Sequence, residues 1–260
     1  MERRFSAPYW IALIAAPVAA GLRIWALLTD LDESRLPVMG PATIVLSLAA
    51  LAYLVLAVIV ANRSKGRSGR YDVLYYGKGG AACAMIAALM IGLGTLLEFL
   101  EALRDGPSMS APLLALVGMV ATICLFVAAG DRRQERKRHE PAEVLPVAYL
   151  LIKLLVNFKA WSTDPIILDY LFRLFALIFA LIAFFLAAGF VFDQGKPRRT
   201  VFFAMGAVFF CAAAVPDGLM DFSLASALLY GGFLLWQLPA LWDLSVPREP
   251  DAAETPKETK

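Results

Sequence analysis

The chain has 260 residues, of which 60% are hydrophobic, and its mean hydropathy is +0.69. A soluble domain has about 45–50% apolar residues, so this composition excludes an ordinary soluble fold. The formal net charge is only +2, which argues against a nucleic-acid partner.

The apolar residues are concentrated in runs that are long enough to cross a lipid bilayer as helices. About 20 residues rising 1.5 Å each span the roughly 30 Å of hydrocarbon. The runs are continuously apolar, whereas the strands of membrane barrels alternate between apolar and polar residues. We therefore predict an all-α, polytopic membrane helical bundle that forms a single transmembrane domain over residues 1–245. Its eight transmembrane helices are expected at 8–28, 41–61, 79–103, 110–130, 144–161, 166–192, 200–216 and 221–243.

The first and third runs contain charged residues inside the predicted membrane. Arg23 lies about a turn and a half from the end of the first run. Residues 3–21 also resemble a signal peptide, but the apolar stretch continues to Leu28, which favours a helix that is retained. Glu98 and Glu101, near the end of the third run, are three residues apart and share a helix face.

The fifth run carries the most deeply placed charge, Lys153. It lies about nine residues, or roughly 13 Å, from either end of the run. A lysine at mid-membrane costs at least about 2.5–3.5 kcal/mol, so it needs a polar partner or water. Tyr149, Lys153 and Asn157 are four residues apart and therefore lie on one helix face. We predict that this face points into the bundle.

The sixth and seventh runs add further charges at a similar depth. Asp169 and Arg173 are four residues apart and can pair within one helix. Asp217 follows Pro216, and because proline removes a helical hydrogen bond, we expect the seventh helix to end or break there. The charges on these runs predict an internal polar network in the outer half of the bundle. This network either binds a ligand or only fixes the helix packing.

The positive charge of the connecting loops alternates along the chain. The N-terminus, every second loop and the tail together carry 18 Lys and Arg, whereas the other loops carry 2. The central loop contributes five of them, among which Arg132 and Arg133 are counted as loop residues. Because the basic loops of a membrane protein are the cytoplasmic ones, both termini are predicted to be cytoplasmic. The opposite loops are acidic, and Asp30 lies at the start of the first of them.

The central polar stretch divides the chain into two halves, 8–130 and 144–245, in which charges recur in a loosely similar order. Four runs in each half would form a parallel repeat, which in transporters has its ligand at the repeat interface. The alternative is a coincidental similarity between apolar helices. Residues 246–260 are rich in Pro, Glu, Lys and Thr and are predicted to form a disordered cytoplasmic tail.

Two functions are compatible with these features. The first is a small-solute transporter or substrate-binding membrane component in a bacterial inner membrane, and its solute would be polar or cationic because the outer loops are acidic. The second is a scaffold or accessory subunit whose basic face, residues 131–138, contacts anionic lipid of the bilayer or a membrane or cytoplasmic partner protein. The predicted ligand-binding residues are Arg23, Glu98, Glu101, Tyr149, Lys153, Asn157, Asp169, Arg173 and Asp217.

The sequence favours a protein without catalytic activity, metal or cofactor. His139 is the one histidine and lies in a basic loop, which argues against zinc or Ser-His chemistry within the membrane. Cys83, Cys124 and Cys211 lie far apart within apolar runs and are interpreted as small core residues. The surroundings of Lys153 separate the two functions, because a wet cavity that is open to one side would support transport, whereas a closed salt bridge would favour a scaffold.

Overall fold

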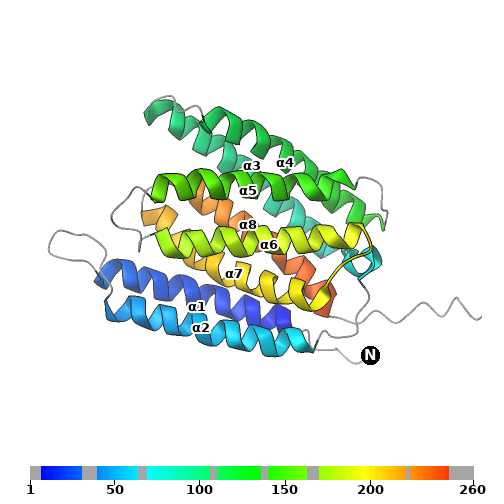
Figure 1. Cartoon of the computed structure of the whole chain (residues 1–260), viewed down its shortest axis with the longest axis horizontal. Coiled ribbons are helices and arrows are strands. Elements are labelled where there is room, and N and C mark those ends of the chain that lie inside the picture. The colour runs from blue at the N-terminus through cyan, green and yellow to red at the C-terminus, as the bar shows by residue number, and fades with distance from the viewer. Residues whose placement is uncertain are drawn as a thin grey trace, which may run out of the picture.

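The computed structural model describes residues 7–30, 40–63, 69–105, 110–135, 140–162, 170–220 and 223–245. Within these ranges the chain forms α-helices and one short 3-10 helix, with no strand, so the predicted all-α bundle is confirmed. The elements are α1 (Ala7–Thr29), α2 (Pro41–Asn62), η1 (Tyr71–Leu74), α3 (Lys78–Asp105), α4 (Ser110–Arg133), α5 (Pro141–Trp161), α6 (Leu171–Val191), α7 (Pro197–Met220) and α8 (Leu224–Ser245), as shown in Figure 1.

Eight of the helices in the described ranges are long and apolar enough to cross a membrane, and each coincides with one predicted run. The chain is therefore a multi-pass membrane protein. Helices that follow one another in the chain run in opposite directions, so the bundle has two ends (Figure 1). We call the end where α1 finishes beside Asp30 the Asp30 end. The opposite end, where α4 finishes beside Arg132, is the Arg132 end.

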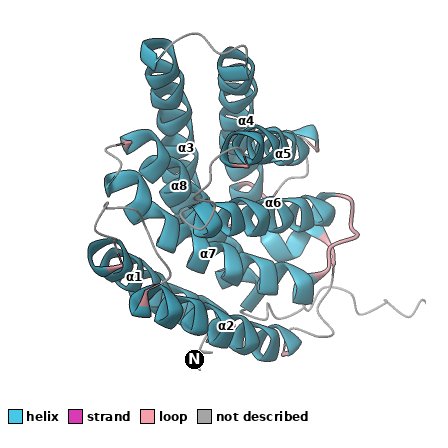
Figure 2. Ribbon diagram, turned by 60° about the vertical axis from the view of Figure 1, so that its left-hand side comes forward, coloured by secondary structure: helices cyan, strands magenta, loops and turns pink. Residues whose placement is uncertain are grey.

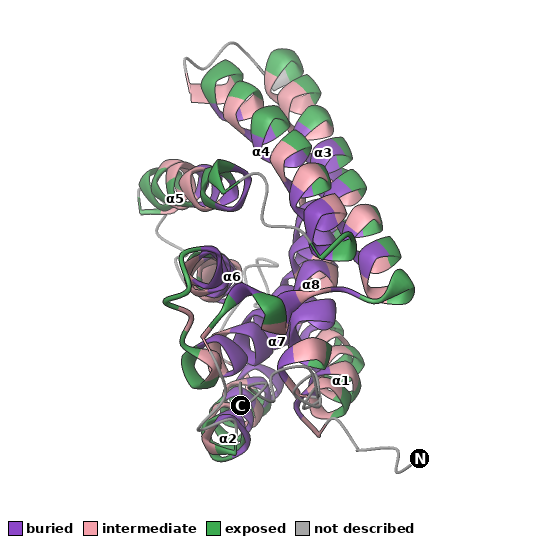
Figure 3. Ribbon diagram, turned by 90° about the vertical axis from the view of Figure 1, so that its right-hand side faces the viewer, coloured by how far each residue is buried: buried purple, intermediate pink, exposed green. Residues whose placement is uncertain are grey.

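The core of the bundle is built around α7 and α8. Helix α7 packs against α1, α2, α6 and α8, and α8 also packs against α3. Alanine and glycine make up seven of the sixteen buried residues of α7, and such small residues let membrane helices approach closely. The outer helices turn leucine, isoleucine and valine outward, where a bilayer would cover them (Figure 3). Helices α3 and α4 lie on one side of the α7–α8 pair, and α1 and α2 lie on the other (Figure 2).

Two glycines bring α3 and α8 into close contact. A Cβ atom at Gly94 of α3 would lie 2.9 Å from the carbonyl oxygen of Ala225 on α8. A Cβ atom at Gly232 of α8 would lie 3.0 Å from the carbonyl oxygen of Ala87 on α3. Because each glycine faces the backbone of the other helix, any side chain would push the two helices apart. This contact holds the last third of α3, which contains Glu98, beside the start of α8.

The expected end of the seventh helix at Pro216 was wrong, because α7 continues to Met220. A proline removes one backbone N–H, and at this position the loss falls within the last turns of a long helix. The helix therefore tolerates it. As a result Asp217 is held on a buried helix at the centre of the bundle instead of in a loop.

Candidate functional site

A buried cluster at the Asp30 end joins α1, α6 and α7. The Nε atom of Arg23 donates to Oδ1 of Asp217 at 2.6 Å, and the Nε atom of Arg173 donates to Oδ2 at 3.3 Å. Arg23 also lies over the ring of Phe172, 5.2 Å from its centroid. Asp217 is buried because α7 occupies the bundle centre, so one carboxylate holds the guanidinium groups of two other helices. The structure thus brings three of the predicted residues together.

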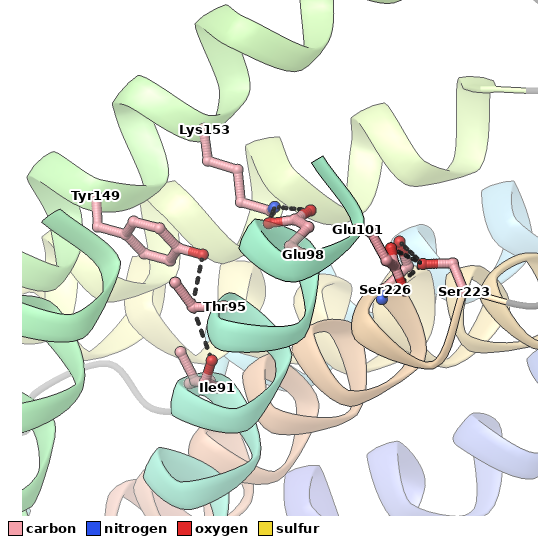
Figure 4. A network of polar contacts seen from close by, with 8 residues as sticks. All are labelled: Ile91, Thr95, Glu98, Glu101, Tyr149, Lys153, Ser223 and Ser226. Carbon is pink, nitrogen blue, oxygen red and sulfur yellow. Dashed lines mark hydrogen bonds and ion pairs between the residues drawn. The ribbon is translucent and has the colours of Figure 1, made fainter. Parts of the chain in front are cut away.

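A second cluster joins α3 and α5. The Nζ atom of Lys153 donates to both carboxylate oxygens of Glu98, at 2.6 and 2.7 Å (Figure 4). The hydroxyl groups of Tyr149 and Thr95 are 3.1 Å apart, and Thr95 donates to the carbonyl of Ile91 at 2.8 Å. The side chain of Lys153 is 1% exposed, whereas that of Glu98 is 28% exposed. The face of α5 that carries Tyr149 and Lys153 is buried, as the sequence predicts.

Glu98 borders two hollows, and Lys153 lines one of them. One is a cavity of about 160 Å³ between α3, α5, α6 and α8. The other has a volume of about 190 Å³ and lies between α3, α4 and α5, and both are lined by Glu98 and Asn157. We call the first the α5–α8 cavity. It is lined by Glu98, Lys153, Asn157, Trp161, Arg173, Ser226, Leu229 and Tyr230.

The remaining predicted site residues lie at the edge of this region. Glu101 accepts a hydrogen bond of 3.1 Å from the hydroxyl of Ser223, which lies just before α8 (Figure 4). Ser223 in turn is 3.3 Å from the hydroxyl of Ser226, a residue of the cavity wall. Asp169 lies outside the described residues, so its predicted pair with Arg173 stays a prediction.

Sequence reasoning missed the contribution of α8 to the cavity. Ser226 and Tyr230 are four residues apart and so share the face of α8 that lines it. Neither residue is charged, and hydroxyl side chains are ordinary in membrane helices. The i, i+4 spacing of two hydroxyl groups was the one available signal, and it is too common to identify a site.

The two ion-paired clusters cross between the predicted halves of the chain. Arg23 of α1 pairs with Asp217 of α7, and Lys153 of α5 pairs with Glu98 of α3. In each case the first helix of one half contributes the cation and the third helix of the other half contributes the acid. A parallel repeat would produce this arrangement, although the repeat itself stays a prediction.

A third ion-paired cluster lies at the Arg132 end and involves a residue that the sequence pattern places in a loop. Arg132 belongs to α4, is fully buried, and donates to both oxygens of Glu143 at 2.8 and 2.6 Å. It also donates to the hydroxyl of Tyr76 and lies 5.7 Å from the ring centroid of Trp236. Counting Arg132 as a loop charge was therefore wrong. Its acidic partner is eleven residues away, beyond the polar connection, so hydropathy placed both at the surface.

The phenol of Tyr76, which precedes α3, remains protonated in this cluster. Burial raises the pKa of Tyr76 to about 12, although the neighbouring Arg132 guanidinium acts in the opposite direction. At neutral pH the phenol can thus accept from Arg132 while keeping its own proton. The cluster ties the ends of α4, α5 and α8 together and closes the bundle at the Arg132 end.

Asp30 connects α1 to the start of α2. Its carboxylate accepts hydrogen bonds from the backbone N–H groups of Thr43 at 2.6 Å and of Ala42 at 3.4 Å. Burial raises the pKa of Asp30, but these hydrogen bonds outweigh it and hold the pKa below its ordinary value. A side-chain acceptor at a helix start satisfies N–H groups that have no partner within the helix.

Replacing Asp30 by asparagine is expected to lower the free energy of unfolding by roughly 0.5–2 kcal/mol, the usual contribution of a cap. A lowered folded-state pKa contributes stability above the ordinary carboxyl pKa and loses it as the pH falls through the folded value. The difference in Tm between the wild type and Asp30→Asn should therefore be constant near neutral pH and shrink in acid. Thermal unfolding in detergent at a series of pH values measures it. A difference that grows in acid would contradict this assignment.

The described part of the chain offers no group of three or more His, Cys, Asp or Glu side chains that could hold a metal ion. Cys83, Cys124 and Cys211 are free thiols, and Cys211 is fully buried. Comparison with known proteins found no family model, no curated protein and no solved structure that matches this chain. The function must therefore be argued from the site itself.

Proposed function

We propose that this protein binds a small polar solute in the α5–α8 cavity and acts as a transporter or as the substrate-binding component of a transport system. The observation that carries the proposal is that charged and hydrogen-bonding side chains from four helices line one cavity. Charged groups inside a membrane protein are costly and commonly mark solute pathways.

The salt bridge between Lys153 and Glu98 is compatible with solute binding. The pair forms part of the cavity wall and does not fill the cavity. Glu98 retains an exposed fraction of 28% and borders both hollows. Binding sites in transporters also lie where helices from different parts of the chain meet, as α3, α5, α6 and α8 do here.

The loop charges supply an orientation for this proposal. Exposed basic residues gather at the Arg132 end, and the positive-inside rule assigns such an end to the cytoplasm. Both termini would then be cytoplasmic, and the cavity would lie in the outer half of a bacterial inner membrane. The exposed basic residues of the described chain at this end include Arg63, Arg70, Arg133, Lys196, Arg198 and Arg199.

A scaffold or accessory subunit is the second candidate. The same basic surface would contact anionic lipid or a partner protein, and the closed ion pairs would serve only to hold the helices. The specific observation in its favour is the short distance of 2.6 Å between Lys153 and Glu98, which requires no ligand.

Replacing Lys153 by leucine is expected to weaken solute binding by about tenfold or more, because it removes one of the two cations of the cavity wall, the other being Arg173. Binding is measured as the thermal stabilisation of the purified protein by a panel of amino acids, amines, carboxylates and polyols. Uptake into proteoliposomes gives a second readout. The matched control is Lys159→Leu, which removes an exposed lysine from the same helix and should leave binding unchanged.

Two outcomes would overturn the proposed function. One is a wild-type protein that is stabilised by no compound of the panel. The other is a Lys153→Leu variant that is well expressed and retains wild-type binding and uptake. Either result would favour the scaffold.

A further inference from the structure

Resting on the proposed function, we propose that the solute of the α5–α8 cavity is a small zwitterion, which carries an ammonium group and a carboxylate on one compact molecule. The chemical class is that of the small neutral α-amino acids. The Lys153–Glu98 pair brings both signs of charge to the wall of one cavity.

The charge of a ligand decides whether both members of this pair keep a partner when the ligand binds. A solute that carries one charge attracts one member of the pair and leaves the other with a weakened partner. Leaving one charge of a buried pair without compensation is strongly unfavourable. A zwitterion supplies a carboxylate to the Lys153 ammonium and an ammonium to the Glu98 carboxylate. Every charge then keeps a partner, and the net charge of the site does not change.

The hydrogen-bond donors and the carboxylate of the cavity wall come from different helices. Arg173 of α6 and Asn157 of α5 line the cavity, and their side chains carry N–H donors of the kind that suit a carboxylate. The Nε atom of Arg173 already donates to Asp217. Glu98 of α3 is the carboxylate of the wall and suits an ammonium. The carboxylate of the ligand would therefore face α5 and α6, and its ammonium would face α3. Tyr230 and Ser226 add hydroxyl groups that can donate or accept.

The volume of the cavity, about 160 Å³, suits a small solute. At roughly 30 Å³ per water molecule it holds about five waters, or a solute with a similar number of non-hydrogen atoms. Glycine and alanine are of this size. The apolar wall is small and consists mainly of Leu229 and the ring of Trp161, which leaves room for a methyl group.

The test compares three compounds that differ in which charged groups they carry. Alanine carries both groups, ethylamine lacks the carboxylate, and propionate lacks the ammonium. Each is added at equal concentration to the purified full-length protein, and binding is followed by thermal stabilisation and by calorimetry. We expect alanine to bind with a Kd about tenfold or more below that of either single-charge analogue or of their equimolar mixture.

The double variant Lys153→Leu/Glu98→Leu provides the control. It removes both members of the pair, so it leaves no unpaired charge and is expected to fold. Alanine should no longer stabilise it. Lys159→Leu should respond to alanine as the wild type does.

The outcomes separate this inference from the proposed function. If no compound of the broader panel binds, both fail. If ethylamine, propionate or an uncharged polyol binds as well as alanine, and Lys153→Leu abolishes that binding, the proposed function stands and the zwitterion is overturned. If alanine binds the double variant as well as the wild type, the Lys153–Glu98 pair is not its recognition site and the inference is overturned.

Discussion

Replacement of Arg132 by methionine is expected to lower the free energy of unfolding by about 3–5 kcal/mol. The guanidinium of Arg132 is fully buried and makes two hydrogen bonds to Glu143, whose side chain is only 7% exposed. Without Arg132 the Glu143 carboxylate would remain buried without a cation, and this unpaired charge dominates the cost. A loss of this size should lower Tm in detergent by about 10 °C.

Two further variants test the reason for this loss. Arg133 is the exposed neighbour of Arg132 on α4, so Arg133→Met should change the stability by less than about 0.5 kcal/mol. The double variant Arg132→Met/Glu143→Leu removes both charges and should recover most of the lost stability, since no buried charge is left. If the double variant is no more stable than Arg132→Met, the cost comes from lost packing and not from the unpaired carboxylate.

Replacement of Asp217 by asparagine is expected to have a comparable effect, about 3–5 kcal/mol. One buried carboxylate holds Arg23 at 2.6 Å and Arg173 at 3.3 Å. Neutralising the Asp217 carboxylate leaves two positively charged guanidinium groups close together without the negative charge that offsets their repulsion. Because Arg173 also lines the α5–α8 cavity, solute binding should weaken along with Tm.

Because two arginines share one acid, the effects of Arg23→Leu and Asp217→Asn on stability should depend on each other. Arg23→Leu should destabilise the wild type, but it should destabilise Asp217→Asn less or even stabilise it, because it then removes one of two repelling cations. Thermal unfolding of the four proteins of this double-mutant cycle measures the coupling. Asp72→Asn is the control, because Asp72 is exposed. Strictly additive changes in stability would show that Asp217 does not link the two arginines.

The candidate site could be predicted in part, residue by residue. Lys153 was identifiable because a lysine near the middle of an apolar run must have a polar partner, and its helical spacing from Tyr149 indicated the buried face. Its partner Glu98 was among the predicted residues, but the pairing was not, since the two positions are 55 residues apart. Ser226 and Tyr230 could not be predicted, because an uncharged hydroxyl side chain costs little free energy in a membrane helix and does not stand out in the hydropathy pattern.

Arg132 is a buried residue that the sequence pattern wrongly placed in an exposed loop. A run of basic residues after an apolar segment is typical of a cytoplasmic loop, and the sequence pattern treats every member of such a run alike. In the structure Arg132 lies inside the bundle while Arg133, the next residue, is exposed. The difference arises from the rotation of α4 about its axis, which directs one residue toward Glu143 and Tyr76 and the next toward the outside.

The sequence by itself determined the number of helices, their approximate limits and their membrane-spanning character. These properties depend on local quantities, namely the length and the hydrophobicity of each run, which can be read without knowing its neighbours. The tertiary structure decided which charges pair and where a cavity remains. Arg23 and Asp217 are 194 residues apart, and they meet because α1 packs against α7, with small residues at many helix contacts. Such contacts depend on the packing of all the helices together, so no single segment of the chain contains them.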